Sequence, residues 1–198
     1  MTRRSLFFGL VCLLTCLRAF TQGTFVYDQQ STVFLEGAVE IIDSNQPVGQ
    51  SFTPSLSAVN FIMLILVDAS PFSPAGASAY VNLRANSISG PILGISDVVT
   101  MANNTGDVRT FLFPSAIPLT PGTMYYFQPI VLAGGDRWIS AVSQGYAGGT
   151  AFVHGVPATD GHFWFQEGII VPEPSSLVLL LFGAGVVARF ANRKRSYL

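Results

Sequence analysis

The sequence has little cysteine, and both cysteines lie near the start of the chain. Cys12 and Cys16 are the two cysteines among 198 residues. Thiol catalysis, cysteine-ligated metals and disulfides are therefore excluded for the rest of the chain. A domain formed by that remainder is stabilised by its core alone. Roughly 150 residues suffice for one domain, because a chain of that length buries about 70% of its unfolded surface.

Positive charge is scarce in the middle of the chain. Residues 22–171 hold three of the ten cations and ten acidic residues, which gives this span a net charge of −7. Such a surface repels phosphate-rich partners, so the composition argues against nucleic-acid binding. The other seven cations lie near the two ends of the chain.

Catalytic and cofactor motifs are also missing. The chain contains no Gly-x-Ser-x-Gly, no His-Glu-x-x-His, no P-loop and no Gly-x-Gly-x-x-Gly. We therefore expect no catalytic residue, no cofactor and no enzyme activity. Spacing alone does not exclude a carboxylate pair for glycoside hydrolysis among Glu36, Glu40 and Glu167, because tertiary structure sets such distances. A small secreted glycan hydrolase is the least favoured alternative.

Two histidines lie close together in the last third of the chain. His154 and His162 flank a segment that contains Asp160, and two imidazoles with one carboxylate would make a small metal site. A β-hairpin that turns at Asp160 and Gly161 explains the same residues more simply. We expect the hairpin and no metal.

An apolar run near the end of the chain is followed at once by cations. Residues 177–188 carry no charge, and a segment of this kind stops in a membrane with its basic end in the cytoplasm. Twelve residues rise about 18 Å, which is short of the roughly 30 Å hydrocarbon core. The candidate membrane-stop charges are Arg189, Arg193, Lys194 and Arg195.

Pro172, Glu173 and Pro174 precede the apolar run, and with them the tail resembles the PEP-CTERM sorting domain of Gram-negative bacteria. Pro172, Glu173 and Pro174 match its Pro-Glu-Pro, residues 177–188 match its short transmembrane helix, and the cations match its Arg-rich end. The resemblance covers residues 171–198 and implies that an exosortase, a membrane enzyme, recognises and removes the tail. The alternatives are an ordinary tail anchor and a buried core helix, although a core helix would carry a polar face that this run lacks.

Residues 1–21 have the three-part form of a secretory signal peptide. Arg3 and Arg4 form the positive region, residues 6–17 are apolar, and Ala19 and Thr21 supply small residues at a cleavage site. We predict passage through the secretion translocon and a mature chain that begins after Thr21. An uncleaved N-terminal anchor is the alternative.

The middle of the chain, residues 22–170, has the periodicity of β-strands. Residues 58–67 are too apolar to alternate and predict a strand buried on both faces, whereas residues 78–85 alternate between apolar and polar. Turns rich in proline and glycine separate the candidates. Further short strands are predicted at residues 33–42, 50–53, 92–101, 109–113, 123–132, 138–142, 150–153 and 162–166.

This pattern predicts an all-β fold, a jelly-roll-like β-sandwich of about 8–10 strands. We expect an N-terminal signal helix and a C-terminal transmembrane helix to flank it. The middle also resembles a β-sandwich module found in bacterial surface and PEP-CTERM proteins, through Gln50-Ser-Phe-Thr53 and the segment from Leu119 to Tyr126. That resemblance implies the fold and no activity.

Aromatic residues near glycine-rich loops offer a candidate binding site. Trp138, Tyr146 and Trp164 lie in the last third of the chain, and flat rings beside polar groups stack on sugars. The alternative is that these rings pack in the core.

The sequence thus predicts an exported protein of a Gram-negative bacterium. It crosses the inner membrane, is held there transiently by its tail, and reaches the cell surface or the extracellular matrix. The resemblance implies a structural or adhesive role in exopolysaccharide or biofilm, with exopolysaccharide as a further partner. A carbohydrate-binding module is the main alternative.

Overall fold

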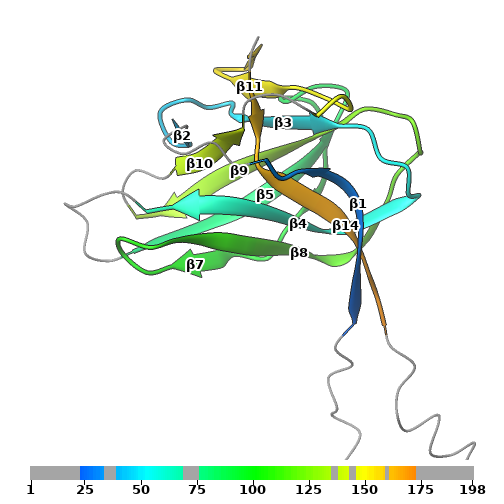
Figure 1. Ribbon diagram of the computed structural model, residues 1–198, viewed down its shortest axis with the longest axis horizontal. Coiled ribbons are helices and arrows are strands. Elements are labelled where there is room, and N and C mark those ends of the chain that lie inside the picture. Colours follow the sequence, from blue (N-terminus) through cyan, green and yellow to red (C-terminus); the bar gives the residue numbers. More distant parts are fainter. Residues whose placement is uncertain are drawn as a thin grey trace, which may run out of the picture. The chain divides into compact units, whose positions relative to one another are not determined.

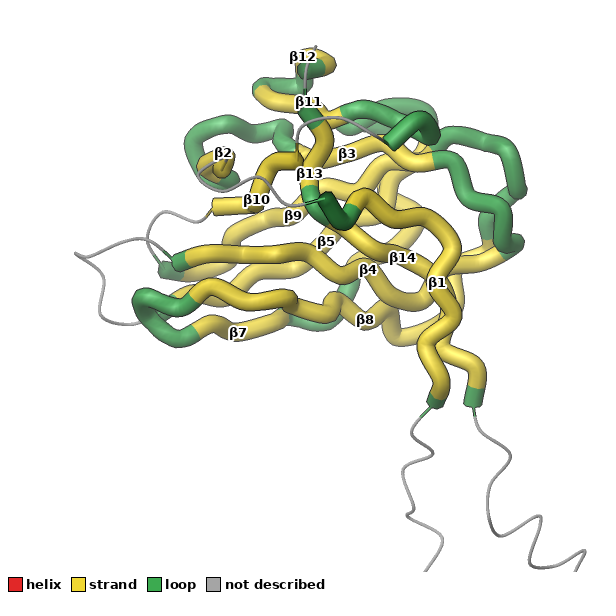
Figure 2. The backbone as a smooth tube through the Cα atoms, viewed as in Figure 1, coloured by secondary structure: helices red, strands yellow, loops and turns green. Residues whose placement is uncertain are grey.

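The computed structural model describes residues 23–33, 39–68, 76–134, 138–142, 146–158 and 161–172. All regular secondary structure in these ranges is β-strand, as the yellow segments of Figure 2 show. The chain divides into two units, one of residues 1–24 and 171–198 and one of residues 25–170. The second unit contains nearly all of the described strands, and the first contributes only the outer ends of β1 and β14.

The first sheet is built around its long central strand, β4. Strand β8 pairs along one edge of β4, while β14 and β10 share the other edge, opposite residues 61–64 and 66–67 respectively. Strand β1 neighbours β14, as Figure 1 shows. The strands of this sheet are β1 (Thr24–Ser31), β2 (Val39–Ile41), β4 (Ala58–Val67), β8 (Gly106–Pro118), β10 (Trp138–Val142), β13 (His162–Phe163) and β14 (Phe165–Val171).

The second sheet has the order β12-β11-β3-β9-β5-β6, with β7 also paired to β5. Its longest pairing joins β5 to β9 in an antiparallel ladder. The strands of this sheet are β3 (Gly49–Phe52), β5 (Ala77–Ala85), β6 (Ile92–Ile95), β7 (Val99–Met101), β9 (Tyr125–Ala133), β11 (Ala151–Val153) and β12 (Val156–Pro157).

Phenylalanines from both sheets meet in one core. Phe165 of the first sheet lies 5.1 Å from Phe127 and 6.5 Å from Phe52 of the second sheet, measured between ring centroids. All three side chains are fully buried. The two sheets therefore pack face to face as an antiparallel β-sandwich. The all-β sandwich is confirmed, and the jelly-roll subtype stays a prediction.

The two strands with the clearest patterns form as predicted. Strand β4 is buried on both faces because side chains cover each of them: Ile62 and Leu64 belong to the main core, whereas Phe61 packs in a second apolar cluster. Strand β5 places Ala79, Val81 and Leu83 in the core. The flanking helices predicted at the two ends lie outside the described residues.

One predicted strand, residues 92–101, is in fact two. Strand β6 ends at Ile95, and the backbone N–H of Asp97 then donates to the carbonyl of Leu112 in β8, at 2.7 Å. Because Leu112 belongs to the other sheet, the ladder with β5 stops until β7 resumes it.

Other predicted boundaries also differ from the structure. Strand β8 extends beyond residues 109–113 at both ends, and residues 162–166 divide at Trp164 into β13 and a longer β14. Of residues 33–42 only β2 is a described strand, with residues 34–38 outside the described ranges. Strand β1 was not predicted.

A close approach of two backbones fixes β1 on β14. A Cβ atom at Gly168 of β14 would overlap the carbonyl oxygen of Val26 in β1, and that oxygen has no rotamer by which to move away. We therefore expect Gly168→Ala to lower the free energy of unfolding by about 1–3 kcal/mol, the usual cost of overpacking. Chemical denaturation measures this directly.

Gly106→Ala is the matched control for this substitution. The nearest atom to its new methyl group would be in the Val67 side chain, at 3.2 Å, so a small shift of that side chain accommodates it. Equal losses of stability in the two variants would contradict the close packing of β1 on β14.

Candidate functional site

A carboxyl group is buried on the core side of β14. Glu167 lies opposite Ile62 of β4 and is 0% exposed. Its Oε1 accepts a hydrogen bond from the backbone N–H of Gln29 in β1, at 3.0 Å. Its Oε2 is buried without a hydrogen-bond partner in the part of the chain that the structure describes. Burying a half-satisfied acid costs free energy, so this is where polar chemistry is most constrained.

A second carboxyl group, Asp28, precedes Gln29 on β1 and faces the loop after β3. Its Oδ2 accepts the backbone N–H groups of Ser55 and Leu56, each at 2.8 Å. Its Oδ1 accepts the Ser55 hydroxyl and, at 3.2 Å, the Gln29 side-chain amide. Burial raises the pKa of Asp28, but these hydrogen bonds outweigh it, and the net pKa lies below the ordinary 3.8. Asp28 is therefore an anion that ties β1 to this loop.

Tyr146 completes the polar cluster from the segment before β11. Its hydroxyl donates to Oε1 of Gln29 at 3.2 Å and accepts the backbone N–H of Thr53 at 3.4 Å. Burial, together with the nearby Glu167 and Asp28 charges, raises the pKa of Tyr146 to about 12. The phenol thus keeps its proton at neutral pH. We call Asp28, Gln29, Tyr146 and Glu167 the clasp.

A neutral imidazole and a buried amide lie beside the clasp. The ring of His162 meets the Tyr146 ring edge-on at 5.9 Å, and its Nδ1 lies 3.3 Å from Nε2 of Gln50. Gln50 is fully buried, and its Oε1 accepts the backbone N–H of Phe163 at 3.0 Å. Burial lowers the pKa of His162, so the ring is uncharged at neutral pH.

One acid of the clasp, Glu167, has a strongly raised pKa. Burial and then repulsion by the Asp28 carboxylate raise the pKa of Glu167 to about 8, although the hydrogen bond from Gln29 favours the ionised form. Glu167 is therefore mostly protonated at pH 7. A carboxyl group in this state acts as a neutral hydrogen-bonding group inside the sandwich.

The clasp joins elements that are far apart in the chain. Its hydrogen bonds connect β1 to β14, to Ser55 and Leu56, and to Tyr146. The Tyr146 hydroxyl in turn accepts the backbone N–H of Thr53. Its acids face the protein itself, since Glu167 is enclosed in the core and both oxygens of Asp28 accept hydrogen bonds from it. The arrangement is suited to holding strands together in a pH-dependent way.

The rings nominated for sugar stacking occupy different surroundings. Tyr146 belongs to the clasp and is 9% exposed, while Trp164 is 8% exposed and packs with Phe61 and Met63. Neither ring offers an open face of the kind that a sugar stacks on. Trp138 lies in β10, and its side chain is outside the described residues. Sugar stacking through Trp138 stays a prediction.

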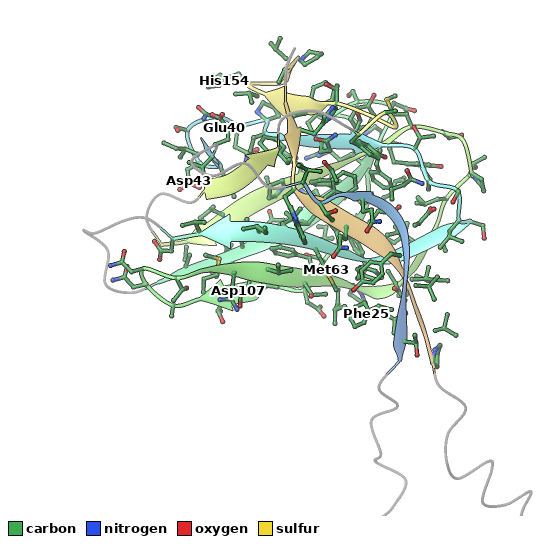
Figure 3. All side chains as sticks on the ribbon, in the orientation of Figure 1. Phe25, Glu40, Asp43, Met63, Asp107 and His154 are labelled. Carbon is green, nitrogen blue, oxygen red and sulfur yellow. The ribbon has the colours of Figure 1, made fainter. Side chains whose placement is uncertain are left out.

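The hairpin predicted between the two histidines turns earlier than expected. His154 and Gly155 have φ angles of 53° and 74°, and they join β11 to β12. His154 is thus at the hairpin tip (Figure 3). The predicted turn residue Asp160 lies outside the described residues. Among the residues that are described, no group of three or more His, Asp or Glu side chains is placed to hold a metal.

The sequence nominated Glu167 only as one of three glutamates and missed its place in a buried network. A local signal was present, because Phe163, Phe165 and Glu167 alternate along the chain and the two phenylalanines belong to the core. The partners on β1 had no such signal, since Gln29 is 138 residues away from Glu167.

The end of β14 leads directly into the tail. Strand β14 ends at Val171, and Pro172 is the last described residue. Glu173, Pro174, the predicted signal peptide and the membrane-stop charges Arg189, Arg193, Lys194 and Arg195 lie outside the described residues. The described ranges include no helix that is long and apolar enough to cross a membrane.

Residues 171–195 match the family model of the PEP-CTERM protein-sorting motif. The chain carries a PEP-CTERM sorting motif. This confirms the resemblance of the tail, and it implies processing by an exosortase-type membrane enzyme and sorting to the cell surface. The PEP-CTERM motif begins at the last residue of β14, so no separate domain intervenes. Comparison with curated proteins and with solved structures gave no match.

The pKa of Glu167 predicts how stability depends on pH. Because the folded-state value of about 8 is above the ordinary 4.5, the folded protein binds this proton more tightly than the unfolded chain does. That stabilisation is complete below the ordinary pKa and is lost as the pH rises through the folded-state pKa. We expect the free energy of unfolding to fall between pH 7 and pH 9, and Glu167→Gln to flatten the fall.

Denaturant titrations across this pH range measure the effect. Between pH 7 and pH 9, His162 and Tyr146 do not change the pH dependence of stability. The lowered pKa of His162 affects stability only below its ordinary 6.5, and the raised pKa of Tyr146 only above its ordinary 10.0. Asp107→Asn, at an exposed carboxylate on β8 (Figure 3), is the control and should keep the slope of the parent protein. A parent protein with constant stability from pH 7 to pH 9 would show that Glu167 is not the shifted group.

Proposed function

We propose that this protein is an exported, non-enzymatic component of the cell surface or extracellular matrix. An exosortase-type system delivers it, and the β-sandwich has a structural or adhesive role in exopolysaccharide or biofilm. The observation that carries the proposal is the PEP-CTERM match at residues 171–195, which starts where β14 ends.

The position of the strands fits removal of both end segments. Strand β1 begins at Thr24 and β14 ends at Val171. Cleavage after Thr21 and cleavage beyond Pro172 would therefore leave every described strand whole. The clasp, formed by β1, β14 and the segments beside them, would also survive both cuts. A domain with these properties remains folded after its targeting segments are gone.

The use of polar groups supports a binding or structural role over catalysis. The titratable side chains that cluster in the described sandwich, those of the clasp, hydrogen-bond to other strands and loops. General acid–base catalysis needs a group within reach of a substrate proton. A net charge of −7 over residues 22–171 further favours neutral or basic matrix components over polyanions.

Replacing Pro172, Glu173 and Pro174 with alanine tests the sorting step. We expect the variant to stay uncut in the inner membrane, because the enzyme no longer finds its recognition sequence while the apolar run remains. Cell fractionation with immunoblotting measures the distribution and the size of the protein. The parent protein should appear at the surface or in the medium at the lower, processed mass.

Ser175→Ala with Ser176→Ala is the matched control, since it changes neighbouring residues and keeps the Pro-Glu-Pro. This control should be processed normally. Surface delivery of the triple-alanine variant at the processed mass would refute the proposed sorting route.

A further inference from the structure

Strand β1 carries a strip of exposed apolar side chains. Phe25 and Tyr27 are 37% and 46% exposed, and they share one face of β1 because side chains alternate along a strand. We call them the β1 strip. Figure 3 shows Phe25 on the outer part of β1. Two neighbouring rings on one face form a continuous apolar surface, unlike single exposed apolar residues, which are common on soluble proteins.

The two rings of the strip are held in a fixed arrangement. Their planes are within 19° of parallel, with centroids 6.4 Å apart. Both meet the buried ring of Phe61 edge-on, Phe25 at 4.9 Å and Tyr27 at 5.6 Å. Phe61 in turn packs with Met63. The strip is therefore the outer surface of an ordered apolar layer on β4.

The charged side chain next to the strip makes its hydrogen bonds elsewhere. The adjacent Asp28 uses its oxygens in four hydrogen bonds, to Ser55, Leu56 and Gln29. A sugar site needs side chains that hydrogen-bond the hydroxyl groups around the ring. A lipid–water interface needs none, and it is where tyrosine and other aromatic rings concentrate in membrane proteins. The chemistry of the strip therefore favours a membrane over a glycan.

The length of the tail keeps the strip near the bilayer. The backbone of Val26 lies directly against Gly168, and nine residues lead from Gly168 to Leu177, where the apolar run begins. Nine residues span at most about 30 Å when fully extended. While the apolar run is inserted, the strip thus remains within about one bilayer thickness of the hydrocarbon core.

We infer that the β1 strip rests in the lipid–water interface of the inner membrane while the PEP-CTERM tail is inserted. This contact orients the sandwich on the membrane and presents the segment between β14 and the apolar run at a set height for processing. The inference depends on the proposed function, because it requires an inserted tail. Once the tail is removed, nothing tethers the strip to the bilayer and the domain is released.

A fluorescent label in the strip tests this contact. The protein carries Cys12→Ser and Cys16→Ser, so that an introduced Tyr27→Cys, on the same face of β1 as Phe25, is its only thiol. It is purified uncut from exosortase-deficient cells and placed in phosphatidylethanolamine–phosphatidylglycerol nanodiscs. We expect an environment-sensitive dye at this position to show blue-shifted emission and quenching by brominated lipid. Adding Phe25→Ser should weaken both signals.

Val156→Cys provides the matched control, because Val156 is 63% exposed at the β12 hairpin and its dye should report water. Co-purification of the protein with the nanodisc measures tail insertion separately. Co-purification with a water-exposed dye at Tyr27→Cys would overturn the inference and leave the proposed function standing. Failure to co-purify would overturn both. Equal lipid quenching at Tyr27→Cys and Val156→Cys would also overturn the inference, since the contact would not be specific to the strip.

Discussion

The hydrogen bond from the Gln29 backbone N–H to the Glu167 carboxyl links the two strands nearest to the ends of the sandwich. Strand β1 has exposed side chains along most of its length, so core packing alone does not hold it. Polar contacts and one close backbone approach hold the strand in place as well. They are the hydrogen bond to Glu167, the hydrogen bonds of Asp28, and the approach of Gly168 to Val26. This arrangement buries the carboxyl group of Glu167, which disfavours its ionised form. The free-energy cost of the burial is small while the group stays protonated.

The same geometry bears on the proposed route of export. The predicted signal peptide leads into β1, and the PEP-CTERM motif follows β14, so both targeting segments join neighbouring strands. A chain that has not yet crossed the membrane completely lacks one of these strands, and the clasp forms only when both are present. Folding and completed export are linked in this account, and the short tail suits a segment whose role is recognition followed by removal.

Local patterns in the sequence were enough to predict part of the fold. The apolar run of β4 and the alternation of β5 fix a buried central strand and a half-buried one, because side-chain direction in a strand depends only on position. The division between β6 and β7 depends on a hydrogen bond from Asp97 to the opposite sheet, and no local pattern encodes that bond. The clasp was not predicted for the same reason, since its partners are 138 residues apart. The tail could be predicted because a sorting motif is a local signal that another protein has to read.

Intact-mass spectrometry of the protein recovered from the cell surface or the medium tests whether both end segments are removed, since one mass reports both ends of the chain. We expect a chain that begins near Gln22 and lacks the apolar run and basic residues of 177–198, with the β-sandwich complete. Recovery of the full 198-residue chain from the surface, or its confinement to the cytoplasm, would show that the two end segments are not removed during export and sorting.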